Sequence, residues 1–250
     1  NVHGYLIADG DKIPDKGELT YRGINIEDIV RGCDAEDRFG FEEVAWLLIF
    51  GHLPTRSQYE GFSRLLFENR ELPEYFPEDM IIKAPSKNIM NKLARSVLAL
   101  YSYDDSPDDL SLENNMRQSI SLIARMPSIM SYAYQVKRRH FDRESMFFHP
   151  YEPDHATAEA ILNALRPDRK FTHQEAKLLD LLMVLHAEHG GGNNSTFTTR
   201  VLTSAGTDMY SAIGAAVGSL KGFKHGGANH QVRMMMDDLM AHVERWDDED

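Results

Sequence analysis

The chain has 250 residues, of which 42% are hydrophobic and 26% are charged, a balance typical of a soluble globular protein. Its formal net charge of −12 argues against a nucleic-acid-binding surface, because phosphate backbones need a basic face. No apolar run approaches the ~20 residues that span a bilayer. The single cysteine, Cys33, excludes an internal disulfide. We therefore expect a cytoplasmic protein with neither nucleic-acid nor membrane partners.

Both ends of the chain look trimmed. The first residue is Asn1 rather than methionine, and no signal peptide is visible. The last four residues, Asp247–Asp250, form an acidic run directly after a predicted helix. From these features we expect the chain to be part of a longer protein.

The N-terminal half reads as a small β-segment followed by short helices. Residues 1–25 are polar and rich in turn signals, with a short strand or turn expected at Glu18–Arg22. Pro127 should kink or split the helix in which it lies, and residues 72–85, which hold three prolines, should form a loop. Apolar spacing and capping residues predict helices after the cap Asn25, at 41–50, after the capping box Thr55–Gln58, from about Ser86 to 103, and from Ser111 to about 132.

The C-terminal half is also helical by pattern. A short helix is expected at Asp154–Leu165, and a capping box at Thr172–Glu175 opens a helix over 173–189. That helix is apolar enough from Leu178 to Leu185 to be buried. Asp208 caps one more helix, and another starts near Ala228 or Asn229. We predict an all-α, multi-helix domain with minimal β-structure at its N-terminus.

Two segments leave alternatives open. The helix after Asp208 carries a stripe of small residues, which allows close packing with another helix, either inside the monomer or across a subunit contact. The segment Lys137–Arg143 is the most basic in the chain. It is either a solvated helix end or a phosphate contact.

Two helix-to-loop junctions place histidines beside glycines. In HAEHGGGN, His186 and His189 end a helix before three glycines, and in HGGAN, His225 precedes two glycines and a new helix. Glycines let backbone approach a ligand closely. Because the positive end of a helix dipole disfavours protonation, a neutral imidazole is expected at His225. Such a ring can donate a hydrogen bond to an oxygen that becomes enolic.

His186 and His189 also raise the hypothesis of a metal hydrolase. Zinc hydrolases usually place two helical histidines four residues apart, with a glutamate between them and a third ligand elsewhere. The spacing here is three residues, which argues against a metal site. We expect neither a metal nor a resident cofactor.

Three segments around these junctions resemble the citrate synthase family, bacterial type: LDLLMVLHAEHGGGNNSTF, TSAGTDMYSAIGAAVGSLKG and KHGGAN. The separation of His189 and His225 also agrees with the family pattern. Further support comes from LTYRGI, FEEVA, GHLPT and ATAEAILNALRPDRKF. The resemblance extends over essentially the whole chain.

The resemblance implies a two-domain α-helical fold, a homodimer, and the condensation of acetyl-CoA with oxaloacetate, followed by thioester hydrolysis to citrate and CoA. It implies that His225 hydrogen-bonds the thioester oxygen and stabilises the enol. It also implies that His189 helps to bind oxaloacetate, with Asn193 in the same loop as a second substrate-binding residue. The supporting residues are Ser195, which positions His225, and the loop glycines Gly226 and Gly227.

The chain departs from the family pattern in two ways. The family also uses an aspartate base, a second histidine and several arginines that follow the HGGAN loop, and the chain reaches Asp250 before any of them. We therefore expect residues 1–250 to be the N-terminal, large helical domain, without the small domain and the C-terminal return segment, and to be inactive alone. Phe223 also stands where a proline is usual. The alternatives are a 2-methylcitrate synthase that uses propionyl-CoA and a non-catalytic, truncated paralogue that only dimerises.

Overall fold

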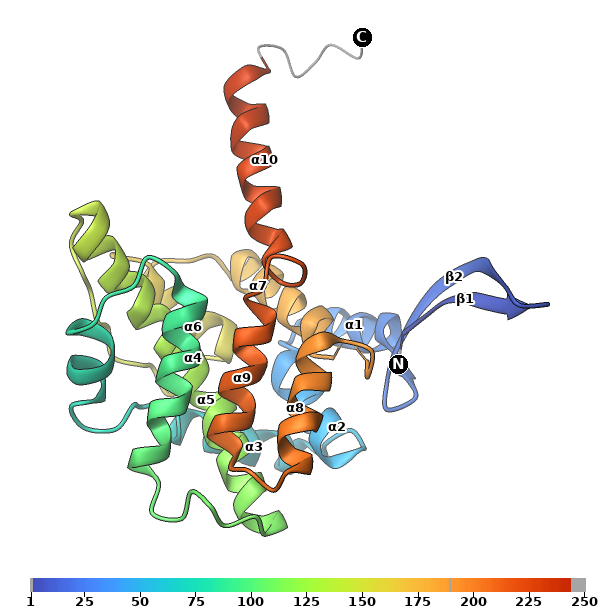
Figure 1. Cartoon of the computed structure of the whole chain (residues 1–250), viewed down its shortest axis with the longest axis horizontal. Coiled ribbons are helices and arrows are strands. Elements are labelled where there is room, and N and C mark those ends of the chain that lie inside the picture. The colour runs from blue at the N-terminus through green and yellow to red at the C-terminus, as the bar shows by residue number, and fades with distance from the viewer. Residues whose placement is uncertain (1, 189, 244–250) are drawn as a thin grey trace.

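The computed structural model describes residues 2–188 and 190–243. This part of the chain is helical apart from a small antiparallel sheet at the N-terminus, which confirms the predicted fold class. Figure 1 shows a body of packed helices from which the β-hairpin projects on one side and the last helix on another.

The N-terminal sheet is longer than the sequence predicts. Strands β1 (Val2–Ala8) and β2 (Asp11–Tyr21) form a hairpin, and β3 (Ile24–Asn25) pairs with the end of β2. The turn is Asp9–Gly10, whose φ angles of 54° and 90° suit the Asp-Gly sequence of tight hairpins. Most of β2 is exposed, so it has no buried face and no alternating pattern from which a strand could be predicted.

The helices follow in chain order, and several begin at the capping residue that the sequence marks. The predicted capping boxes at Thr55 and Thr172 are both formed, and the side chains of Asn25 and Asp208 cap their helices. The elements are α1 (Ile26–Ala35), α2 (Phe41–Phe50), α3 (Arg56–Glu68), η1 (Pro77–Ile82), α4 (Ile89–Ala99), η2 (Leu100–Tyr103), α5 (Leu112–Lys137), η3 (Arg138–Asp142), α6 (Thr157–Leu165), α7 (His173–His186), α8 (Asn194–Ser204), α9 (Met209–Leu220) and α10 (Ala228–His242).

Of the two outcomes predicted at Pro127, the split is wrong, because α5 runs through the proline without a break, and the kink stays a prediction. Tertiary contacts beyond the proline hold the helix in place. The hydroxyl of Ser128 donates to the backbone oxygen of Arg70 at 2.8 Å, and the Gln135 amide donates to the carbonyl of Ala164 at 3.2 Å. These contacts lie far apart in sequence, so no local pattern predicts them.

The predicted loop at residues 72–85 and the basic segment also contain helical turns. Pro77–Ile82 forms the turn η1, whose Ile81 is fully buried. The basic segment closes α5 and forms η3, where Arg138 pairs with Glu144. Ile81 joins Leu72 and Phe76 of the same segment in the largest core cluster, so apolar burial orders a segment whose prolines predict a loop.

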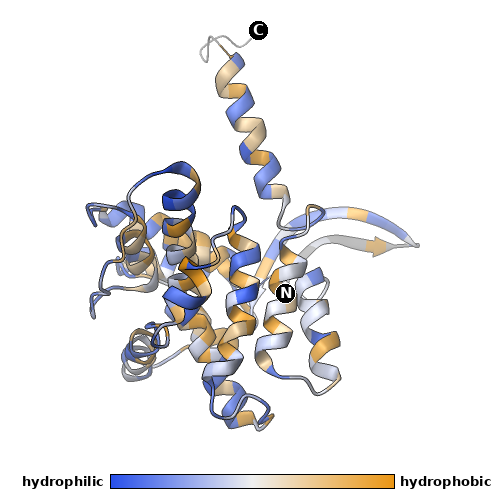
Figure 2. Ribbon diagram, turned by 60° about the vertical axis from the view of Figure 1, so that its left-hand side comes forward, coloured by the Kyte–Doolittle hydropathy of each residue, from blue (hydrophilic) through white to orange (hydrophobic). Residues whose placement is uncertain are grey.

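Three buried clusters make up the core. The largest joins α4, α5 and α9, the second joins Tyr21, α1 and α2 to α7, and the third lies between α2, α3 and α5. Figure 2 shows apolar residues gathered on these helices, whereas the projecting α10 is mixed along its length. None of the residues of α10 is buried. Among the described residues, no helix combines the length and apolar composition needed to cross a membrane.

The small-residue stripe of α9 is used inside the chain. Helix α9 packs against both α4 and α8. At Gly214, an added Cβ would lie 3.4 Å from the carbonyl oxygen of Ala94 on α4, so the two backbones approach closely. Of the two alternatives left open, the pair inside the monomer is therefore present.

The predicted burial of the helix over 173–189 is wrong. Helix α7 ends at His186, and only Ala176, Asp180 and Val184 are buried in it. Three of its five leucines are exposed, Leu178, Leu182 and Leu185 by 60%, 45% and 40%, and the other two are half-buried. An apolar pattern indicates a surface that packs against another, but it does not show whether the covering surface belongs to the same chain.

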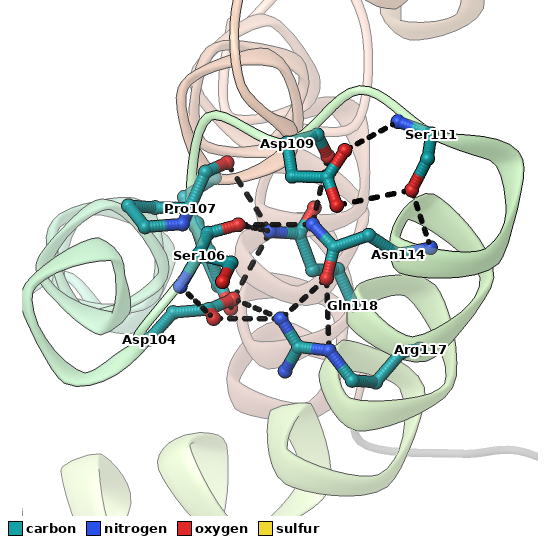
Figure 3. A network of polar contacts seen from close by, with 9 residues as sticks. Asp104, Ser106, Pro107, Asp109, Ser111, Asn114, Arg117 and Gln118 are labelled. Carbon is teal, nitrogen blue, oxygen red and sulfur yellow. Dashed lines mark hydrogen bonds and ion pairs between the residues drawn. The ribbon is translucent and has the colours of Figure 1, made fainter.

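A polar corner joins α5 to the start of α9 (Figure 3). Asp104, whose side chain is 3% exposed, accepts hydrogen bonds from Arg117, Gln118 and Tyr210, the last at 2.6 Å. Burial alone would raise the pKa of Asp104, but these hydrogen bonds and one from the Ser106 amide hold that pKa well below its usual range. The buried carboxylate thereby fixes the first turn of α9.

A second buried carboxylate joins α7 to α2. Helix α2 begins at Gly40 without a side-chain cap of its own. Asp180 of α7 supplies the cap, since it accepts the amide of Gly40 at 2.7 Å and that of Phe41 at 3.1 Å. Burial raises the pKa of Asp180 to about 6, although the two backbone hydrogen bonds lower it.

We predict that Asp180 gives the protein a stability that falls with rising pH. Because the pKa of Asp180 is higher in the folded state than the usual ~3.9 of an unfolded chain, the folded state binds the extra proton, and this contribution is lost as pH rises through about 4 to 6. The unfolding free energy of wild type relative to Asp180→Asn should therefore shrink over that range in urea titrations. Asp28→Asn, on the exposed face of α1, is the control. A constant or growing difference would contradict the prediction.

Candidate active site

The first histidine junction is held by the N-terminal segment. The fully buried Tyr21 donates its hydroxyl to the carbonyl oxygens of Val184 and Leu185, at 2.8 and 3.2 Å. These carbonyls belong to the last turn of α7, where Val184 also accepts the amide of the C-cap residue Ala187 at 3.3 Å. His186 follows, exposed, with Nδ1 2.7 Å from the carbonyl of Leu182. The segment LTYRGI therefore positions the end of α7.

The loop after α7 turns back sharply into α8. Gly190 adopts a left-handed φ of 76°, and its amide donates to the carboxylate of Glu188 at 2.6 Å. Asn193 then caps α8, because its side-chain oxygen accepts the amides of Ser195 and Thr196 at 2.8 and 3.3 Å. The sequence offers Asn193–Thr196 as candidate caps for the segment that follows, and Asn193 is the residue that caps α8. Its predicted substrate contact stays a prediction. His189, the other predicted substrate-binding residue, lies outside the described residues.

The second junction follows α9, which lies beside α8. The amide of Asn194 donates to the hydroxyl of Ser219 at 2.7 Å and ties the start of α8 to the end of α9. The chain then closes a tight turn, in which the amides of His225 and Gly227 both donate to the carbonyl of Gly222, at 2.9 and 3.0 Å. The turn brings the second junction back over the first.

The two junctions meet in one hydrogen bond. Ser195 Oγ lies 2.9 Å from His225 Nε2, and both residues are half-buried. Among the described residues, Nδ1 of the same ring has no hydrogen-bond partner. The predicted pair is thus brought together from loops 30 residues apart. One ring nitrogen is fixed by the serine, and the other is left for a ligand.

The glycines of the HGGAN loop are required by space. A Cβ added at Gly226 would lie 2.6 Å from the carbonyl oxygen of Leu220, and one at Gly227 would lie 2.6 Å from Cα of Phe223. Both contacts are with the turn's own residues, mainly backbone, which cannot move aside cheaply. The predicted supporting role of Gly226 and Gly227 is to let the turn close under His225.

A cavity of about 520 Å³ flanks the same loop and was not predicted. Its walls come from α4, α7, the turn after α9 and the start of α10. Phe223, which is 74% exposed, lines it at the position where the family usually has proline. Its lining residues include Met90, His186, Leu220, Phe223 and Gly226. Its walls come from four separate segments, so the sequence offers no signal for it.

The described residues offer no set of side chains that could bind the metal of a hydrolase. Among residues 2–188 and 190–243, no group of three or more His, Cys, Asp or Glu side chains is placed to hold a metal ion. Nδ1 of His186 lies 2.7 Å from the carbonyl of Leu182 in its own helix.

We predict that Gly226→Ala disrupts the loop. The added methyl group must displace the backbone of Leu220, which should cost about 1–3 kcal/mol of unfolding free energy. Gly218→Ala is the matched control, because an added Cβ meets nothing within 4 Å there and alanine favours a helix by up to about 1 kcal/mol. Chemical denaturation compares the two. Equal stability of the two variants would show that the turn tolerates the methyl group.

The chain is similar to proteins of known family. A family model described as the C-terminal domain of citrate synthase matches residues 7–249. The citrate synthase of Haloferax volcanii is 35% identical over 90% of the chain and 57% of its own length. The 2-methylcitrate synthase of Shewanella oneidensis is 29% identical over 88% of the chain and 55% of its own length.

A solved structure gives the same result. The crystal structure of citrate synthase from Pyrobaculum aerophilum superposes with a TM-score of 0.75 at 29% identity, and the match covers 86% of the chain and 52% of that protein. The chain thus spans about half the length of the relatives that it matches. The family model covers nearly every residue, and the chain therefore belongs to the citrate synthase family.

Proposed function

We propose that the full-length protein condenses acetyl-CoA with oxaloacetate to give citrate and CoA. The observation that carries this proposal is the 2.9 Å contact between Ser195 Oγ and His225 Nε2, formed by the two motifs that the family shares. Because the chain spans about half the length of its relatives, the activity is proposed for the longer protein. The present residues are proposed to form the large domain and one side of its active site.

The contact with Ser195 allows either tautomer of His225, and we propose that the serine hydroxyl donates to Nε2. When the serine hydroxyl donates to Nε2, the neutral ring carries its hydrogen on Nδ1. Nδ1–H then donates to the thioester oxygen as a proton leaves the acetyl methyl group, and stabilises the developing enol. That proton passes to the base proposed below. The enol carbon then attacks the keto carbon of oxaloacetate, whose oxygen takes up a proton and becomes the hydroxyl of the citryl thioester. Water then hydrolyses the citryl thioester and releases CoA.

Substrate binding is proposed for the first junction. Asn193 uses its side-chain oxygen as the α8 cap, so its amide NH₂ is the part left to contact a carboxylate. His189, four residues earlier, is proposed to bind the same oxaloacetate. The base, a second histidine and the arginines that hold the oxaloacetate carboxylates are proposed to come from the remainder of the protein.

The second candidate is a 2-methylcitrate synthase, since relatives with that name match at 29% and 32% identity. The two reactions differ by one methylene in the acyl group, which changes selectivity by about 10–200-fold. The ratio of kcat/KM for acetyl-CoA and propionyl-CoA decides between them. We propose acetyl-CoA, with no metal or resident cofactor, in a cytoplasmic enzyme.

We predict that His225→Ala lowers kcat of the full-length protein by about 10²–10⁴-fold, because it removes the hydrogen bond made to the developing enol. Ser195→Ala should reduce kcat less, since the ring remains but loses its orientation. A thiol reagent that detects CoA release measures both. The 250-residue chain alone should fold without turnover. Steady turnover by this chain would contradict the proposal that it carries only one side of the active site. No activity of the full-length wild type would favour a non-catalytic paralogue.

A homodimer is proposed from the exposed apolar residues beside the packed helices. Phe197 and Val201 on α8 are 62% and 49% exposed, and Leu98 on α4 is 51% exposed. Both helices pack against α9, so α4, α9 and α8 lie side by side in one layer (Figure 1). Apolar residues of this size gathered on one layer are typical of protein interfaces.

We predict that Phe197→Asp together with Val201→Asp converts the dimer to a monomer. Two charges buried without partners would cost several kcal/mol at the interface. Sedimentation equilibrium measures the mass, and Leu112→Asp, at an exposed position of α5 outside this layer, is the control. A wild-type chain that sediments as a monomer would contradict the proposed interface.

A further inference from the structure

A second cleft lies between α2, α3 and residues 153–156. It encloses about 580 Å³, within the range of small-molecule sites, and shares no lining residue with the cavity beside His225. Its lining includes buried charges, three aromatic rings and several exposed carboxylates.

Two charged side chains that line this cleft are buried without being paired. Glu42 and Arg70 are each 2% exposed. Glu42 uses one oxygen to accept the amide of Thr157 at 2.7 Å, and its Oε2 has no partner. The Arg70 side chain makes two long hydrogen bonds, 3.4 Å to the hydroxyl of Thr157 and 3.5 Å to the carbonyl of His155, and its guanidinium lies 5.8 Å from the ring centre of Tyr151. Its Nε has no hydrogen-bond partner. Buried charges normally pair with each other. Here both line one cleft, and neither contacts the other.

The cleft therefore offers an acceptor and a donor at the same time. A ligand that carries both an ammonium and a carboxylate group satisfies Glu42 and Arg70 together. His155, whose buried Nδ1 also lacks a partner, adds one more possible donor to the carboxylate side. A simple cation would pair only with Glu42, and a simple anion would pair only with Arg70. In either case the other buried charge would stay unpaired.

The walls and rim select the rest of the ligand. Three aromatic rings form the apolar wall, which suits an alkyl stem or the face of a cation. Beyond them, the rim is mainly acidic, with one arginine. The aromatic residues are Phe39, Tyr59 and Phe67, the acidic rim residues are Glu60, Glu68, Asp154 and Glu159, and the rim arginine is Arg64.

We propose that this cleft binds a free basic α-amino acid of the lysine or arginine type. The α-ammonium group donates to Glu42, the α-carboxylate accepts from Arg70, and the basic side chain crosses the aromatic wall to the acidic rim. The site is separate from the proposed catalytic loop, so its occupancy can be measured without turnover.

Isothermal titration of the 250-residue chain with four probes tests the site. L-lysine and L-arginine should bind. L-norleucine, which lacks the terminal charge, and 1,5-diaminopentane, which lacks the carboxylate, should each bind at least about tenfold more weakly, since each loses one charge-assisted contact. Glu42→Gln keeps the shape and the Thr157 contact but should weaken L-lysine binding by about tenfold or more.

A variant of the exposed rim tests the site without changing a buried residue. Glu68→Gln with Asp154→Asn changes two exposed residues, so it should fold normally, and it should bring the affinity for L-lysine close to that for L-norleucine. Glu113→Gln, an exposed residue outside the cleft, should bind L-lysine as wild type does. Absence of binding by both basic amino acids at millimolar concentration, or equal binding of all four probes, would overturn the proposal and would leave water as the partner of the buried charges.

Discussion

The hydrogen bond between Ser195 and His225 is the contact on which the proposed chemistry depends. It forms because two helix ends are fixed against each other. Asn193 caps α8 and sets the position of Ser195, while the tight turn after α9 sets that of His225. Asn194 bonded to Ser219 holds the two helices in register. A loop histidine becomes a defined hydrogen-bond donor only through this support.

The same constraint extends outward to two buried carboxylates. Asp104 fixes the first turn of α9, and Asp180 joins α7 to α2. Their pKa values move in opposite directions because Asp104 accepts several side-chain donors, whereas Asp180 is dominated by burial. The helix that leads to each histidine junction is thus anchored at a polar contact far from the loop itself.

The sequence predicted the elements with strong local signals. Capping boxes at Thr55 and Thr172 begin their helices as expected, and the His225 loop has the glycines that its turn requires. The misses depend on distant contacts. Helix α5 passes through Pro127 because residues beyond it bond to other segments. The exposed leucines of α7 were predicted to be buried, because an apolar pattern does not show whether the covering surface belongs to the same chain. The cleft at Glu42 and Arg70 unites segments that no local pattern connects.

The central claim is that Ser195 sets the tautomer of His225 and leaves Nδ1–H directed at the substrate. Nitrogen-15 NMR of histidine-labelled protein at about pH 8, above the ordinary pKa of histidine, distinguishes the two neutral tautomers. His225→Gln identifies the resonance. The account predicts the Nδ1–H form in the wild type and a loss of that preference in Ser195→Ala. A predominant Nε2–H form in the wild type would contradict it.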